Sequence, residues 1–321
     1  MSNKTTIPGC DKELSRIIMG TMIIGLNNYD VSAALLDSAM ALGINAFDIA
    51  NVYGGGDSER AVGKWMEERG NRGDVFIVTK GAHPNKDRNR VTPYDITSDL
   101  MDSLARLRTG YIDAYLLHRD DLSKPVDPIM DVLHDHCAAG RIGAFGGSNW
   151  TSGRIAEGNA YSVSRGQKAM TVSSPNYGLC DQVDDPWGPG CVTISGSDGA
   201  AEREFYIREK IPVMAYSSLG RGMLSGRVSR DNYTGLLDGA ALIAYAHEVN
   251  FAKLDRASEL AEEKGVSVPQ IALAYILNQP FNVFPIVGAA SGKELGEAVA
   301  AADIVLTAQE LAWLDTGARQ R

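Results

Sequence analysis

The feature that most constrains the fold is a regular alternation of short apolar segments with longer segments of helical periodicity. The apolar segments are rich in β-branched residues and have the length of strands. They span residues 17–23, 45–50, 75–80, 112–118, 143–149, 170–176, 213–218 and 283–289. Because they are apolar at nearly every position, we expect strands buried on both faces, as in a parallel sheet.

Helical segments separate these strands. They span residues 31–42, 57–69, 95–108, 126–139, 151–163, 201–210, 253–264 and 293–302, with a further helix from about residue 269. Asp30 and Asp57 are candidate caps of the first two helices, and Thr92-Pro93 is a helix-entry signal for the third. Eight strand–helix repeats in a chain of 321 residues predict a (β/α)8 TIM barrel.

A doubly wound open sheet is the alternative to a barrel. That fold normally carries a G-x-G-x-x-G turn after its first strand, whereas here GLNNYDVS follows. No proline- or serine-rich linker divides the chain, so we predict one domain over residues 1–321. Two long connections, 178–200 and 219–252, leave the carboxyl ends of the sixth and seventh strands. Barrel enzymes place their sites at that end, so both connections are candidate walls of an active site.

Charge and cysteine usage exclude several classes of protein. The net charge of −9 would repel a nucleic-acid backbone. The polar amino-terminal segment lacks the apolar core of a signal peptide, and no window reaches the roughly 18 apolar residues of a membrane span. Cys10, Cys137, Cys180 and Cys191 are widely spaced, without a CxxC pair, and read as ordinary thiols. We expect a cytoplasmic, metal-free protein that binds neither nucleic acid nor membrane, with a homo-oligomer left open.

Polar residues stand at the ends of three successive apolar strands. These are Asp48, Lys80 and His118, and Tyr53 follows Asp48 by five residues. Each alone reads as a structural or surface residue. A charged group is rarely buried unless it is paired, however, and the carboxyl ends of parallel strands meet at one edge. Together the four residues predict one shared site.

These residue types suit the reduction of a carbonyl by hydride. The developing alkoxide needs a proton donor, and a free tyrosine has a pKa of about 10. The ammonium of Lys80 would lower the pKa of Tyr53, and Asp48 would hold that ammonium charged. His118 would polarise the carbonyl through a hydrogen bond, and a nicotinamide cofactor would supply the hydride.

Several spaced motifs resemble the aldo-keto reductase family, and in particular its bacterial members near the channel beta-subunit branch. They are FDIANVYGGGDSERAVG, VFIVTKG, IDAYLLHRDD, GGSNW, AYSSLGRGMLSG and IVGAASGKELGEAV, and they cover nearly the whole predicted barrel. The resemblance implies a TIM-barrel oxidoreductase that uses NAD(P)H to reduce an aldehyde or ketone. It also implies that Asp48, Tyr53, Lys80 and His118 occupy the family's catalytic positions.

The same resemblance implies a set of cofactor-binding residues. They are Ser148, Asn149, Ser174, Tyr216, Ser217, Leu219, Arg221, Gly222, Gly226, Gly288, Ala290, Ser291, Lys293, Glu294 and Glu297. The chain departs from the family pattern at three positions: Ser174 replaces a glutamine, Glu294 an arginine or glutamine, and Ala298 an asparagine. An acid near the ribose disfavours a 2′-phosphate. Lys293 and Ser291 could still hold such a phosphate, and the resemblance implies the family's usual NADP(H), with NAD(H) as the alternative.

Polar and aromatic residues near the strand ends are candidate substrate contacts. They are Asn51, His83, Asn85, Arg119, Asp120, Trp150 and Trp187. Such a lining favours a sugar, keto-sugar or polyol-like carbonyl compound over an apolar aldehyde. One alternative function is a nucleotide-binding regulatory subunit of the same fold with little turnover. Another is a Schiff-base aldolase that uses Lys80.

Overall fold

Eight parallel strands form a closed barrel in the computed structural model, which describes residues 4–318. The strand order is β10-β3-β4-β5-β6-β7-β8-β9. The strands are β3 (Ile18–Gly20), β4 (Ala46–Asp48), β5 (Phe76–Gly81), β6 (Ile112–Leu117), β7 (Ile142–Ser148), β8 (Val172–Ser174), β9 (Val213–Ala215) and β10 (Val283–Val287). All eight predicted strands are present. The predicted barrel is confirmed, and the doubly wound alternative is wrong.

The predicted helices are also present. They are α1 (Tyr29–Ala41), α2 (Asp57–Arg69), α3 (Pro93–Arg106), α4 (Asp127–Ala138), α5 (Ser152–Ser164), α6 (Ala200–Glu209), α9 (Glu248–Lys264), α10 (Val268–Leu277) and α11 (Gly292–Ala300). Elements that we did not predict are a hairpin of β1 (Lys4–Ile7) and β2 (Cys10–Ser15), and the helices α7 (Tyr233–Leu236), α8 (Gly239–Tyr245) and α12 (Ala308–Thr316). Short 3-10 turns add η1 (Tyr53–Gly56), η2 (Gly220–Gly222) and η3 (Ala301–Asp303).

Two of the predicted helix caps are wrong. Asn28 occupies the N-cap position of the first helix, without a side-chain capping bond, and Asp30 lies in the first turn. The second is preceded by Gly56, and the Asp57 carboxylate instead accepts the backbone N–H of Leu26 at 2.7 Å. In both cases the chain enters the helix earlier than the acidic residue. Thr92 does cap α3, as predicted, and accepts the N–H of Asp95.

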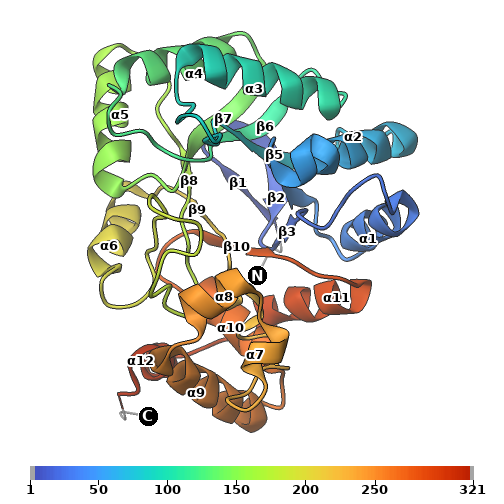
Figure 1. Cartoon of the computed structure of the whole chain (residues 1–321), viewed down its shortest axis with the longest axis vertical. Helices are drawn as coiled ribbons and strands as arrows, with labels where there is room; N and C mark the ends of the chain where they lie inside the picture. Colours follow the sequence, from blue (N-terminus) through green and yellow to red (C-terminus); the bar gives the residue numbers. More distant parts are fainter. Residues whose placement is uncertain (1–3, 319–321) are drawn as a thin grey trace. The chain divides into compact units, whose positions relative to one another are not determined.

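Residue contacts group the chain into two compact units, and the prediction of a single domain stays a prediction. The first unit runs to Ser174 and includes Gly288–Gly292. It contains β3 to β8, and its helices α1 to α5 lie side by side along the chain order (Figure 1). Its barrel strands are buried along almost their whole length; Phe47, Phe76 and Tyr115, for example, have no exposed surface.

The second unit runs from Pro175 to Val287 and continues from Lys293. Within it β9 pairs in parallel with β10, Val213 opposite Val283. Its buried Lys253 on α9 donates to the carboxylates of Asp181 and Asp315, each at 2.7 Å, and so ties the connection after β8 to α12. Among residues 4–318 no helix is long and apolar enough to cross a membrane.

Candidate active site

Strand register within the first unit brings the predicted polar residues to one edge. Asp48 is the last residue of β4, and Lys80 is the penultimate residue of β5. Backbone pairing continues past the strand ends: Asn51 N–H donates to the Lys80 carbonyl and His118 N–H to the Gly81 carbonyl, both at 2.8 Å. Asp48, Lys80 and His118 therefore start from backbone that is held in the sheet, whereas Tyr53 begins the 3-10 turn η1.

The Lys80 ammonium is the centre of the cluster. It donates to the Asp48 carboxylate at 2.7 Å, to the Ile49 carbonyl at 3.0 Å and to the Tyr53 hydroxyl at 3.2 Å. Lys80 is 2% exposed and Asp48 3% exposed, so this is a buried ion pair with a phenol beside it. The predicted association of Asp48, Tyr53 and Lys80 is present in the structure.

His118 completes the group as a neutral imidazole. It follows β6 directly, and its ring lies edge-on to that of Tyr53, with centroids 6.0 Å apart. Burial lowers its pKa well below the usual value, and the nearby charge of Lys80 lowers it further. A neutral ring keeps one N–H, so His118 can donate one hydrogen bond to a substrate oxygen.

The pKa of the Tyr53 phenol shifts opposite to our expectation. Burial raises it, and the Lys80 ammonium lowers it by a smaller amount, so the net direction is upward. The effect of Lys80 itself has the predicted sign. Burial, which the sequence does not reveal, outweighs it. Burial also raises the pKa of Asp48, against the attraction of Lys80.

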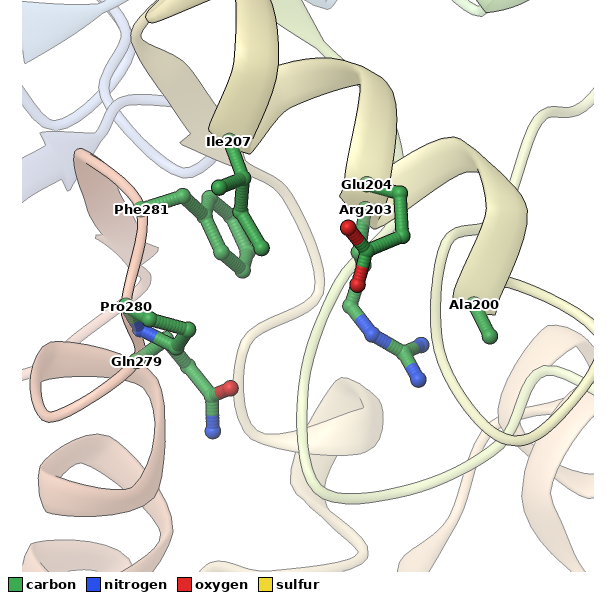
Figure 2. Close-up of a pocket in the computed structure, with 7 residues that line it drawn as sticks. All are labelled: Ala200, Arg203, Glu204, Ile207, Gln279, Pro280 and Phe281. Carbon is green, nitrogen blue, oxygen red and sulfur yellow. The ribbon is translucent and has the colours of Figure 1, made fainter.

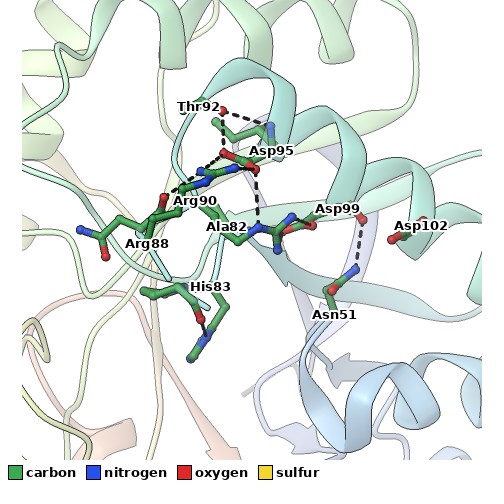
Figure 3. Close-up of polar contacts among 12 residues, drawn as sticks. Asn51, Ala82, His83, Arg88, Arg90, Thr92, Asp95, Asp99 and Asp102 are labelled. Carbon is green, nitrogen blue, oxygen red and sulfur yellow. Dashed lines mark hydrogen bonds and ion pairs between the residues drawn. The ribbon is translucent and has the colours of Figure 1, made fainter. Parts of the chain in front are cut away.

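His83 stands against His118 on the connection that follows β5. The two rings are perpendicular, with centroids 4.8 Å apart. The turn that carries His83 is anchored to α3, because the Ala82 N–H donates to the Asp99 carboxylate at 2.8 Å (Figure 3). Arg90 grips the same carboxylate at 2.6 and 3.1 Å. Neither Arg90 nor Asp99 was predicted.

The other predicted substrate residues differ in their surroundings. Arg119 is partly exposed, and its guanidinium donates to the His118 carbonyl at 3.1 Å. Trp150 has no exposed surface, and its indole N–H donates to the Arg119 carbonyl, so it helps to fix the backbone of Arg119. The Asn51 amide donates to the Asp99 carbonyl, and Asp120 pairs with Arg154 at 2.9 Å. Asn85 caps its own loop by accepting two backbone N–H groups.

Three predicted cofactor residues meet at the ends of β7 and β8. Ser148 donates to the Ser174 carbonyl at 2.8 Å, and the Asn149 amide donates to the Ser148 hydroxyl and to the His118 carbonyl, both at 3.2 Å. The Ser174 hydroxyl is buried and has no hydrogen-bond partner among the described residues. Gly288, Ala290 and Ser291, in the same unit, are exposed.

The second unit carries the remaining cofactor candidates. After β9, the rings of Tyr216 and Trp187 lie 6.2 Å apart, and the Arg221 guanidinium lies over Trp187 and pairs with Asp238 at 2.5 Å. The turn around Arg221 also contains Ser217, Leu219, Gly222 and Gly226; Ser217, Arg221 and both glycines have positive φ. On α11, the exposed Lys293 lies 4.0 Å from Glu297, and Glu294 is exposed.

One further hollow lies in the second unit, at the amino end of β10. It is lined by Ala200, Arg203, Glu204 and Ile207 of α6 and by Gln279, Pro280 and Phe281 (Figure 2). The Arg203 guanidinium beside it donates to the Ile194 and Gly196 carbonyls at 2.5 and 2.7 Å. These residues are not among the predicted site residues, and the hollow brings no nucleophile or acid–base pair together.

Sequence reasoning missed an apolar part of the site edge. Met22 and Ile23, directly after β3, are 62% and 57% exposed. The adjoining Thr21 N–H donates to the Asp48 carbonyl at 3.0 Å, which sets this segment beside β4. The sequence places both residues at the end of the predicted strand 17–23, and it does not show that they are exposed there.

Comparisons with known proteins bear on the family and the fold of the chain. A model of the aldo/keto reductase family matches residues 16–317. The chain is 27% identical to the uncharacterized oxidoreductase YrpG of Bacillus subtilis, over 94% of this chain and 91% of that protein. It is 28% identical to an aryl-alcohol dehydrogenase [NADP(+)] of Phanerodontia chrysosporium, over 96% and 83%. The glycerol dehydrogenase AKR11B4 of Gluconobacter oxydans shares the fold, with a TM-score of 0.79 at 24% identity over 100% of this chain and 98% of that one.

Proposed function

This chain belongs to the aldo/keto reductase family, and on that premise we propose that it uses NADPH to reduce an aldehyde or ketone to the alcohol, with Tyr53 as the proton donor. The proposal depends above all on the Lys80 ammonium, which contacts both the Asp48 carboxylate and the Tyr53 hydroxyl. A buried cation beside a phenol is the arrangement that a tyrosine needs in order to release a proton and carry the resulting charge.

Buried groups in the first unit fit a nicotinamide cofactor, which supplies the hydride when bound. The unpartnered Ser174 hydroxyl lies beside Ser148 and Asn149, and a carboxamide would satisfy it. We favour NADPH over NADH because the exposed Lys293 and Ser291 could bind its 2′-phosphate. The name of the aryl-alcohol dehydrogenase relative also specifies NADP(+). Glu294 opposes a 2′-phosphate, so NADH is the alternative.

The four polar residues then have separate tasks. Tyr53 keeps its proton at neutral pH because burial raises its pKa, and it donates that proton as the carbonyl oxygen becomes an alkoxide. Lys80 stabilises the phenolate left behind, and Asp48 holds Lys80 in place. Neutral His118 donates its N–H to the substrate oxygen, which polarises the carbonyl and orients it.

For the substrate we propose a polar, sugar-like aldehyde or ketone. The partly exposed Arg119 and His83 can bind its polar groups, and Met22 and Ile23 offer an apolar surface for its carbon chain. Asn51, Asp120 and Trp150 are occupied by contacts within the protein. The polar lining is therefore smaller than the sequence suggested, which favours short hydroxylated carbonyl compounds over large sugars.

The decisive experiment measures NADPH oxidation with a panel of carbonyl compounds, for the parent protein and for Tyr53→Phe. We expect the variant to lose about 10²- to 10⁴-fold in kcat, because general acid catalysis is removed. Its affinity for NADPH, measured by fluorescence titration, should stay within about threefold of the parent, since the ring remains. Undiminished turnover in Tyr53→Phe would refute the mechanism. Tight NADPH binding by a parent protein that reduces no carbonyl would favour the nucleotide-binding alternative.

A further inference from the structure

His83 has a fixed tautomer. Its Nδ1 lies 2.8 Å from the carbonyl oxygen of Pro84, and a carbonyl oxygen can only accept a hydrogen bond. Nδ1 therefore carries the proton. In a neutral imidazole the other nitrogen, Nε2, is then left with a lone pair and acts as an acceptor. Burial lowers the pKa of His83, and the charges of Arg119 and Arg90 lower it further, which keeps the ring neutral.

The backbone around His83 fixes the position of its ring. Ala82, which precedes it, has a φ of 58°, a left-handed conformation that is strained for a residue with a side chain. The buried Asp99 carboxylate accepts the Ala82 N–H and is itself gripped by Arg90 (Figure 3). The His83 ring is thereby kept 4.8 Å from that of His118.

Hydrogen-bond donors lie in the same cluster as the His83 ring. The Tyr53 hydroxyl and the His118 N–H are both available to a carbonyl oxygen, and Arg119 can only donate. His83 Nε2 contributes the opposite character, and it has no hydrogen-bond partner among residues 4–318. A substrate that matches this pattern carries an acceptor, the carbonyl, with a donor a few ångströms away.

We propose that His83 is a specificity-determining residue that accepts a hydrogen bond from a substrate hydroxyl next to the reacting carbonyl. The preferred substrates are then 2-hydroxy aldehydes and hydroxymethyl ketones, and their products are vicinal diols. This proposal rests on the proposed carbonyl reduction and narrows its substrate class. His83 takes no part in proton or hydride transfer.

The kinetic test compares lactaldehyde with propanal, which lacks only the hydroxyl. The ratio of their kcat/KM values is measured for the parent protein, for His83→Phe, which keeps a ring but no acceptor, and for His83→Gln, which restores an acceptor oxygen. Dividing one protein's ratio by another's cancels the intrinsic reactivity of the two aldehydes. We expect the ratio to fall about three- to tenfold in His83→Phe and to recover in part in His83→Gln, as for one hydrogen bond lost and regained.

His134→Phe is the matched control. This histidine lies on α4, and its ring accepts the Lys168 N–H. In His134→Phe the ratio of the kcat/KM values for lactaldehyde and propanal should equal that of the parent protein. An equal ratio for the parent and His83→Phe would overturn the proposal.

A second measurement does not depend on turnover or on a folded variant. The chain has only five histidines, so ¹⁵N-histidine labelling resolves each imidazole. His83 should show a protonated Nδ1 and an unprotonated Nε2, and the Nε2 signal should shift with 1,2-propanediol but not with 1-propanol. If neither aldehyde is reduced, the proposed function fails while this measurement still tests His83. A protonated Nε2, or equal shifts with the two alcohols, would overturn the inference.

Discussion

Replacing Lys80 by methionine should destabilise the protein strongly and in a pH-dependent way. Lys80 and Asp48 are 2% and 3% exposed, so the change leaves a carboxyl group buried without its cation. The group then has to be protonated to stay buried. At pH 7 this costs about 1.4 kcal/mol for each of the roughly three units between that pH and its usual pKa, or about 4 kcal/mol. This agrees with the roughly 3–5 kcal/mol typical of broken buried ion pairs.

The sign of the pH dependence follows from the same reasoning. In Lys80→Met the folded-state pKa of Asp48 is raised above its unfolded value. The variant is therefore least impaired near pH 4, and it loses stability as the pH rises toward the folded-state pKa. Relative to the parent, the deficit should grow by up to about 1.4 kcal/mol per pH unit between pH 5 and 7.

The assay is urea-induced unfolding at several pH values, with the double variant Asp48→Asn/Lys80→Met as the control. The double variant has no orphaned charge, so its stability should lie within about 2 kcal/mol of the parent and show no such slope. It should nevertheless be inactive, because Lys80 is needed beside Tyr53. A Lys80→Met deficit that is constant from pH 5 to 7, or equal in the single and double variants, would refute our account of the buried pair.

Two further predictions concern stability alone. Gly146→Ala on β7 would bring a Cβ to within 1.7 Å of the Val172 carbonyl oxygen on β8, so it should lower the free energy of unfolding by about 3 kcal/mol or more. The control is Gly153→Ala, whose Cβ meets nothing within 4 Å and which should be neutral or stabilising by up to about 1 kcal/mol. Equal melting temperatures for the two variants would contradict this prediction. The Arg88 guanidinium lowers the pKa of Asp95 to about 2. Asp95→Asn should therefore cost about 2 kcal/mol above pH 4, and this difference should vanish as the pH falls toward 2, because the depressed pKa stabilises the fold only while the carboxylate is ionised. An unfolding free-energy gap that stays constant over that range would exclude the ion pair as its source.

The barrel could be predicted because strands buried on both faces leave a plain signal. The β1–β2 hairpin could not, because CDKELS in β2 mixes exposed and buried positions and is mostly polar. The four site residues could be predicted because polar groups at the ends of apolar strands are rare. Their supports could not: the sequence does not show that Asp99, inside α3, faces the Ala82 N–H.

The sequence also could not predict the direction of the pKa shift of Tyr53 or the burial of the Trp150 side chain. Both depend on how much protein surrounds a side chain, and no local pattern records that. Trp150 follows Asn149 directly and seemed a natural part of a substrate wall. Its indole is instead covered on all sides and donates to the Arg119 carbonyl. Residue type and strand position predicted which groups meet, whereas their solvation required coordinates.

The acid–base residues all fall between Asp48 and His118, on or shortly after three strands that are consecutive along the chain and adjacent in the sheet. Their assembly therefore needs only the closure of short loops, each with one helix inside, and such contacts form early in folding. During synthesis this stretch leaves the ribosome before the strands that follow it. We expect the Lys80–Asp48 ion pair to be among the first long-lived tertiary contacts of the nascent protein. Substitutions there would then slow folding as well as weaken the native state.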